Sequence, residues 1–198
     1  MTSSAMHPAP AARTASGLLF PGIITALGGV LYFVAGLRFT ADHTAYDRVT
    51  TILTMLWLLG CLVGLAAIAR LGVAGRGILG RTALALAFSG LGVVFLAWLI
   101  GFDDPAAAEG GTLMAVGRVL TLLGFLLLGI ATVRTRCWTG WRRLAPFFYL
   151  LAVVLGALSW ELAGVELTVA FIGLAWVGIG AAVATGGSNG DGRTAADW

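Results

Sequence analysis

The chain has 198 residues, of which 59% are hydrophobic and only 11% are charged, and its mean hydropathy is +0.97. Water-soluble domains carry about 25% charged residues. These values exclude an ordinary soluble domain and predict a chain whose main solvent is lipid. The net charge is +3, but the twelve arginines are divided among short loops. That distribution excludes the single basic face of a nucleic-acid-binding domain.

The chain begins with a short polar segment, residues 1–16, which contains prolines and is predicted to be a disordered cytoplasmic tail. The next run, Gly17–Leu37, has no charged residue and is long enough to cross a membrane as a helix. Because the apolar part of a signal peptide covers only about 7–15 residues, this run is predicted to be a retained first span. At the other end, residues 186–198 are rich in glycine and polar residues and are predicted to be a flexible cytoplasmic tail.

Five further apolar runs follow between these tails. Each is close to the ~20 residues that cross the hydrocarbon core as a helix, and helices satisfy their own backbone hydrogen bonds in lipid. We therefore expect an all-α, polytopic membrane helix bundle of about six transmembrane helices over residues 17–185. The five runs are Val49–Ala69, Thr82–Phe102, Thr112–Val133, Leu144–Trp160 and Leu167–Thr185.

The loops between these runs alternate in charge. The third and fifth loops carry or border only acidic residues, at Asp103, Asp104, Glu109, Glu161 and Glu166. Arginine in short loops marks the cytoplasmic side of a membrane. We therefore expect the spans to lie in a cell (inner) membrane and both termini to lie in the cytoplasm. The arginines of the second and fourth loops are then expected to contact anionic lipid headgroups. They are Arg70, Arg76, Arg81, Arg134, Arg136, Arg142 and Arg143.

A short pattern recurs along the chain. The segment Leu58–Leu62 reads LLGCL, and 64 residues later the segment Leu122–Leu126 reads LLGFL; each is followed by an arginine loop and another span. This pattern is consistent with a parallel repeat in which spans two and three correspond to spans four and five.

Small residues four positions apart occur in four of the spans. Such pairs allow close approach of helix backbones, so we expect packing within the protomer, with a dimer face as the alternative. The pairs are Thr25/Gly29, Gly60/Gly64, Ala152/Gly156 and Gly178/Ala182.

Arg118 is the one charged residue inside an apolar run, about two turns from the start of the fourth span. A charged side chain is costly at this depth, so it requires an explanation. Three remain open: the guanidinium reaches back to the headgroups, it forms an intramembrane ion pair with Glu161, or it belongs to an anion or substrate site.

No stronger chemical motif is present. His43 lies in a loop between Asp42 and Asp47, but this spacing matches no known metal site. The glycine-rich segment 75–81 lacks the lysine of a phosphate-binding loop, and the two cysteines lie in separate segments. We therefore expect no cofactor, no metal and no enzymatic activity.

The first span (LLFPGIITALGGVLYFVAGL), the leucine-glycine helices ending at Arg70 and Arg134, and the turn with Trp138, Gly140 and Trp141 form a recognisable layout. In this layout the chain resembles the small six-span integral membrane proteins of actinobacterial type that have no assigned activity. The resemblance implies a membrane helix bundle and implies no substrate or catalytic residue.

Three functions fit these features. The first is a non-enzymatic accessory or partner-binding membrane component, acting as a homo-oligomer or with a partner subunit. The second is a small oligomeric permease or transporter, for which a cavity reaching Arg118 would be the supporting observation. The third is an enzyme acting on lipid, which would need converging polar groups at one membrane face.

Overall fold

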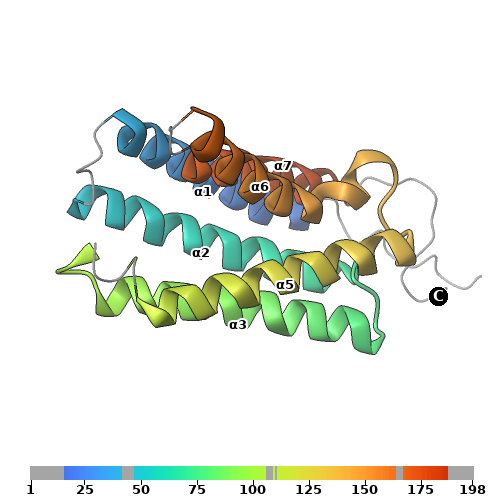
Figure 1. Ribbon diagram of the computed structural model, residues 1–198. Coiled ribbons are helices and arrows are strands. Elements are labelled where there is room, and N and C mark those ends of the chain that lie inside the picture. Colours follow the sequence, from blue (N-terminus) through green and yellow to red (C-terminus); the bar gives the residue numbers. More distant parts are fainter. Residues whose placement is uncertain (1–15, 42–46, 106–108, 110, 164–166, 187–198) are drawn as a thin grey trace, which may run out of the picture.

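The protein is seen in a computed structural model that describes residues 16–41, 47–105, 109, 111–163 and 167–186. Apart from Ser16 and Gly186, both predicted tails lie outside the described residues, as does the loop holding His43. The described chain is helical, with helices of nearly antiparallel direction following one another (Figure 1).

Six helices in the described residues are long and apolar enough to cross a membrane, which confirms the predicted fold class. The chain is a multi-pass membrane protein. A single 3₁₀ turn, η1, leads into the fifth of these helices. The elements are α1 (Ser16–Ala41), α2 (Arg48–Leu71), α3 (Ile78–Ile100), α5 (Thr112–Thr135), η1 (Gly140–Leu144), α6 (Ala145–Ala163) and α7 (Thr168–Thr185).

Local sequence explains where the helices begin and end. Asp47 caps α2: its Oδ1 accepts a hydrogen bond of 2.7 Å from the backbone N–H of Thr50. The same helix ends at Gly72, whose positive φ of 65° suits a residue without a Cβ. Helix α3 begins at Ile78, earlier than the apolar run predicts, because the helix continues past Arg81 to the turn at Gly77. The short fifth run becomes a span of 23 residues because η1 precedes α6.

Helices α1 and α7 are packed almost backbone to backbone. A Cβ built on Gly29 of α1 would lie 2.6 Å from the carbonyl oxygen of Gly173 on α7. Gly22 and Gly36, one heptad to either side, approach Ala184 and Ala170 in the same way. A seven-residue repeat keeps one face of a helix turned to its neighbour, so these glycines form a continuous seam.

Helices α3 and α5 form a second seam of the same kind. A Cβ on Gly90 would lie 2.4 Å from the backbone nitrogen of Thr121, and one on Gly124 would lie 2.4 Å from that of Ala87. Helix α2 lies between the two pairs, and α6 packs against α7 (Figure 1). Small residues thus replace the large core side chains of a soluble bundle.

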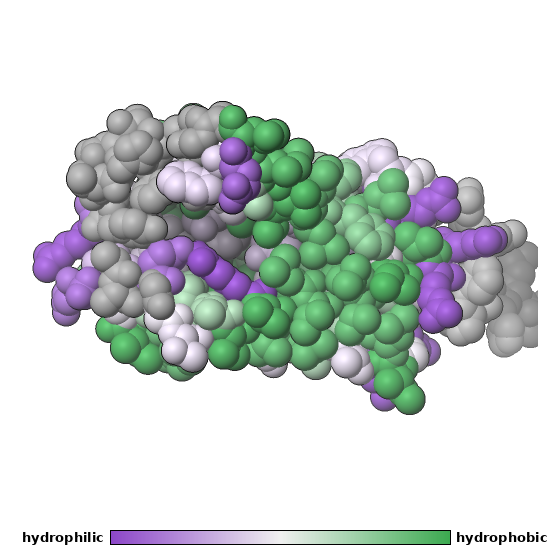
Figure 2. Space-filling view, viewed as in Figure 1, coloured by the Kyte–Doolittle hydropathy of each residue, from purple (hydrophilic) through white to green (hydrophobic). Residues whose placement is uncertain are grey.

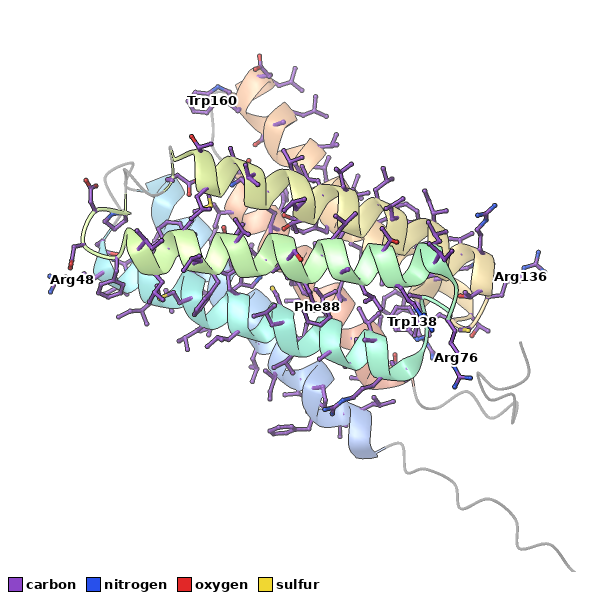
Figure 3. All side chains as sticks on the ribbon, turned by 90° about the horizontal axis from the view of Figure 1, so that it is seen from below. Arg48, Arg76, Phe88, Arg136, Trp138 and Trp160 are labelled. Atoms are coloured by element: carbon purple, nitrogen blue, oxygen red, sulfur yellow. The ribbon has the colours of Figure 1, made fainter. Side chains whose placement is uncertain are left out.

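Polar and apolar residues are separated along the length of the molecule. On the face seen in Figure 2, a green apolar band covers the middle of the molecule, and hydrophilic residues gather toward its two ends. Arg48 lies at one end and Arg76 and Arg136 at the other (Figure 3). We call the first the acidic end, where Asp47, Asp103, Asp104, Glu109 and Glu161 lie, and the second the arginine-rich end, which holds the seven loop arginines named above.

Candidate functional site

A chamber of about 340 Å³ occupies the half of the bundle nearer the acidic end. All six membrane helices contribute to its wall, and its volume is within the range of small-molecule sites in proteins. Hydrophilic side chains extend inward from this end between the green surfaces in Figure 2. The described residues that line the chamber are Tyr32, Ala35, Thr50, Thr54, Trp57, Leu91, Val94, Trp98, Glu109, Met114, Arg118, Thr121, Leu122, Tyr149, Val153, Thr168, Val169 and Ile172.

Three aromatic rings line the inner end of the chamber, those of Tyr32, Trp57 and Tyr149, and they pack on the buried rings of Phe125 and Trp176; we call the five rings the aromatic floor. The rings of Tyr32 and Trp57 are stacked, with centroids 3.7 Å apart and planes 4° from parallel. The edge of Trp176 meets both Trp57 and Phe125, with centroids 6.4 Å and 5.3 Å away. Rings in these geometries hold one another in place, so the floor is a rigid base.

Below the aromatic floor, in the half nearer the arginine-rich end, the bundle is closed. Leu58, Leu65, Leu128 and Val183 are completely buried there, and Ile179 is 1% exposed. The described residues therefore enclose a chamber that ends about midway through the membrane-spanning region.

Arg118 lines the chamber about 9 Å from the start of α5, at 1.5 Å per residue. Its guanidinium Nη2 forms an ion pair with Oε1 of Glu109, nine residues earlier in the chain. The pair considered between Arg118 and Glu161 is not among the ion pairs of the described residues, where Glu161 is exposed near the end of α6.

The ion pair is open to solvent or ligand. The Arg118 side chain is 51% exposed and that of Glu109 is 24% exposed, and both line the chamber. This exposure is compatible with a guanidinium that reaches back to the headgroups and with a ligand site, and the ion pair that Arg118 forms is with Glu109 rather than with Glu161.

Two polar atoms in the chamber wall have no hydrogen-bond partner. They are Nε1 of Trp57, a residue 4% exposed, and Oγ1 of Thr50, a residue 8% exposed. By contrast, the hydroxyls of Thr54 and Thr121, also in the wall, donate to carbonyl oxygens one turn earlier in their own helices. Both atoms are themselves buried, so the chamber does not expose them.

The chamber's chemistry is that of binding. Its described wall carries one carboxylate and one guanidinium, and these already neutralise each other. No group of three potential metal ligands occurs among the described residues. Hydrogen-bond donors, a neutral charge pair and aromatic surface suit recognition of a small amphiphilic molecule.

A second recess of about 410 Å³ lies at the arginine-rich end, between the loops that follow α2 and α5. Arg76, Arg134 and Arg136 line it, and Oγ1 of Thr135 donates to the carbonyl of Val73 across the two loops at 2.7 Å. Arg70, Arg81, Arg142 and Arg143 lie outside it; Nη1 of Arg142 donates to the carbonyl of Thr185.

The small residues singled out in the sequence lie at helix contacts or are buried within the protomer; Gly60 and Gly64 both face α1, whereas Thr25 and Gly29 face different helices. Thr25 faces α2, where its Oγ1 lies 3.2 Å from the carbonyl of Gly60, whereas Gly29 faces α7. A Cβ on Gly64 would meet the side chain of Thr25 at 2.7 Å. On α6 and α7, Gly156 meets Thr168 and Gly178 meets the ring of Phe148, and Ala152 and Ala182 are buried.

Sequence reasoning missed two features of this site. Glu109 is the acidic residue nearest to Arg118 in the chain, and that proximity was a usable signal. The aromatic floor gave no signal, because its five rings come from five helices whose pairing the sequence does not state.

Comparison with known proteins finds no matching family model, no matching curated protein and no matching solved structure. The resemblance to small six-span actinobacterial-type membrane proteins stays a prediction.

Proposed function

We propose that the protein is a small permease that receives an amphiphilic molecule in the chamber at its acidic end. The observation that carries this proposal is the chamber itself, which reaches Arg118 and ends at the aromatic floor. A cavity open toward one side above a closed half is the arrangement expected of one state of an alternating-access transporter.

The proposal ranks above the other two functions. An accessory subunit needs a partner-binding surface and has no use for a charged pair that lines a chamber. A lipid-modifying enzyme needs an acid or base free to transfer protons, whereas Glu109, the one carboxylate in the described chamber wall, is paired with Arg118. The function proposed is therefore binding and translocation without chemical conversion.

We further propose that the protein lies in a cell membrane with its arginine-rich end facing the cytoplasm. The separation of charge between the two ends supports this orientation, because arginine in short loops is retained on the cytoplasmic side. The recess lined by Arg76, Arg134 and Arg136 then lies at the level of anionic lipid headgroups.

The permease proposal is tested by measuring from which side of the membrane a thiol reagent reaches each half of the bundle. In a background with Cys61→Ala and Cys137→Ser, single cysteines are placed at Met114 in the chamber wall and at Leu128 below the floor; these residues are 1% and 0% exposed. Sealed vesicles of each orientation are treated with a charged, membrane-impermeant thiol reagent. We expect Met114→Cys to react from the acidic end and Leu128→Cys to react, more slowly, from the arginine-rich end.

Leu123→Cys is the matched control, because Leu123 is 47% exposed on the apolar surface of the same helix. A thiol there faces lipid, stays protonated and should not react from either side. If Leu128→Cys is as unreactive as Leu123→Cys while Met114→Cys reacts, the protein does not alternate. The chamber would then be a one-sided binding site, and the accessory function would replace the permease.

A further inference from the structure

The ion pair of Arg118 and Glu109 gives the chamber a specific electrostatic character. One positive and one negative group face the same space, so the described wall has no net charge. The other ion-paired arginines of the acidic end lie outside the chamber: Arg38 pairs with Asp47 at 2.9 Å, and Arg48 lies 3.9 Å from Asp103. A ligand therefore meets two opposite charges at short range.

Helices α5 and α6 line the chamber on one flank, through Arg118 and Leu122 of α5 and Val153 of α6. These helices touch near the arginine-rich end, where Gly129 meets the ring of Phe147 and the rings of Phe125 and Tyr149 lie 4.8 Å apart. Toward the acidic end α6 diverges, and Trp160 lies at its tip away from the other helices (Figure 3). There α6 packs instead on α7, through Gly156 and Thr168.

Exposed apolar side chains lie beside the chamber-lining residues of both helices. Val119, next to Arg118 on α5, is 54% exposed, and Val154, next to Val153 on α6, is 55% exposed. A charged pair that is accessible beside apolar surface at membrane depth is suited to a molecule with a polar head and an apolar chain.

From these observations we infer that the chamber binds a membrane lipid with a zwitterionic head, whose phosphate lies on Arg118 and whose ammonium lies on Glu109. The acyl chains leave through the flank between α5 and α6. This inference rests on the chamber of the proposed function but does not require that the lipid be transported.

Charge balance selects the zwitterion. An anionic lipid would gain Arg118 but would place its phosphate beside the carboxylate of Glu109, and a cationic amphiphile would meet the reverse problem with Arg118. Like charges in a partly desolvated site repel strongly, because the effective dielectric constant is well below that of water. A zwitterion inserted between the two groups replaces their contact with two new ion pairs and leaves neither charge unmatched.

The inner end of the chamber completes the site. The rigid aromatic floor limits how deeply the head enters, and a volume of about 340 Å³ leaves the chains outside.

The test is lipid retention by the full-length protein. The protein is equilibrated in detergent with equimolar dimyristoyl phosphatidylethanolamine and dimyristoyl phosphatidylglycerol, and bound lipid is counted by native mass spectrometry. We expect the wild type to retain the zwitterionic lipid at least tenfold over the anionic one. Glu109→Gln should shift this ratio at least tenfold toward phosphatidylglycerol, and Arg118→Gln should reduce retention of both lipids at least tenfold.

Arg48→Gln is the matched control, since it removes an arginine of the same end that lies outside the chamber, and it should leave the ratio unchanged. An equal ratio in the wild type and in Glu109→Gln, or a wild type that prefers the anionic lipid, overturns the inference. Chain-free phosphoethanolamine that displaces the lipid at equal concentration overturns the assigned route between α5 and α6.

The two proposals fail separately. Lipid selectivity with an unreactive Leu128→Cys leaves a lipid-binding protein that does not transport. Reactivity of Leu128→Cys without lipid selectivity leaves a permease for another substrate.

Discussion

Replacing Gly29 by alanine tests whether the backbone seam between α1 and α7 holds the bundle together. The added Cβ would lie 2.6 Å from the carbonyl oxygen of Gly173 and 2.7 Å from the backbone nitrogen of Val177. Both are backbone atoms, so no side-chain rotation relieves the contact. The helices must separate by about 0.8 Å to restore an ordinary contact of 3.4 Å.

The expected effect follows from this displacement. Overpacking of a dense interface destabilises proteins by about 1–3 kcal/mol, and a local separation also weakens the contacts of the neighbouring Gly22 and Gly36. Gly92 on α3 is the control, since it is exposed and a Cβ there meets no atom within 4 Å. Gly92→Ala should therefore stabilise the helix, by up to about 1 kcal/mol, through the lower entropy of the unfolded chain.

The measurement is the free energy of unfolding in mixed micelles for the wild type and both variants. Gly29→Ala should lower it and Gly92→Ala should leave it equal or higher. If the two variants are equally stable, the close approach of α1 and α7 does not determine the stability of the bundle, and the argument from the glycine seam is wrong.

Two further predictions concern hydrogen bonds. The backbone N–H of Thr50, followed by the guanidinium of Arg38, lowers the pKa of Asp47 below its ordinary value of 3.8. The stabilisation that the ionised Asp47 gives to α2 is complete above pH 3.8 and is lost as the pH falls through the lower pKa of the folded state. Asp47→Asn keeps a hydrogen-bond acceptor but has no titrating group, so it should remove this pH dependence. The measurement is the free energy of unfolding from about pH 2 to about pH 6. Thr25→Val should lower the unfolding free energy by about 0.6 kcal/mol, because the hydroxyl bonds to Pro21 and Gly60 are lost, and Thr25→Ser should lower it less.

The spans could be predicted from the sequence because crossing a membrane is a one-dimensional requirement. Apolar length alone placed all six helices, and the main error, at the start of α3, arose because Arg81 was taken as loop. The glycine seams could be predicted only in part. Gly22, Gly29 and Gly36 repeat every seven residues, as do Gly173 and Gly180, and this period was readable in the sequence. Only the structure shows that these two rows face each other, since facing depends on which helices become neighbours.

The partner of Arg118 shows a deeper reason why function resists prediction here. The sequence indicates how deep Arg118 and each acidic residue lie in the membrane. It does not indicate toward which side of the bundle each of these residues faces. Glu161 and Glu109 lie at the same end, and among the described residues only Glu109 pairs with Arg118. Rotation around the bundle therefore decides which carboxylate meets the guanidinium of Arg118, and the apolar pattern that places the spans carries no information on that rotation.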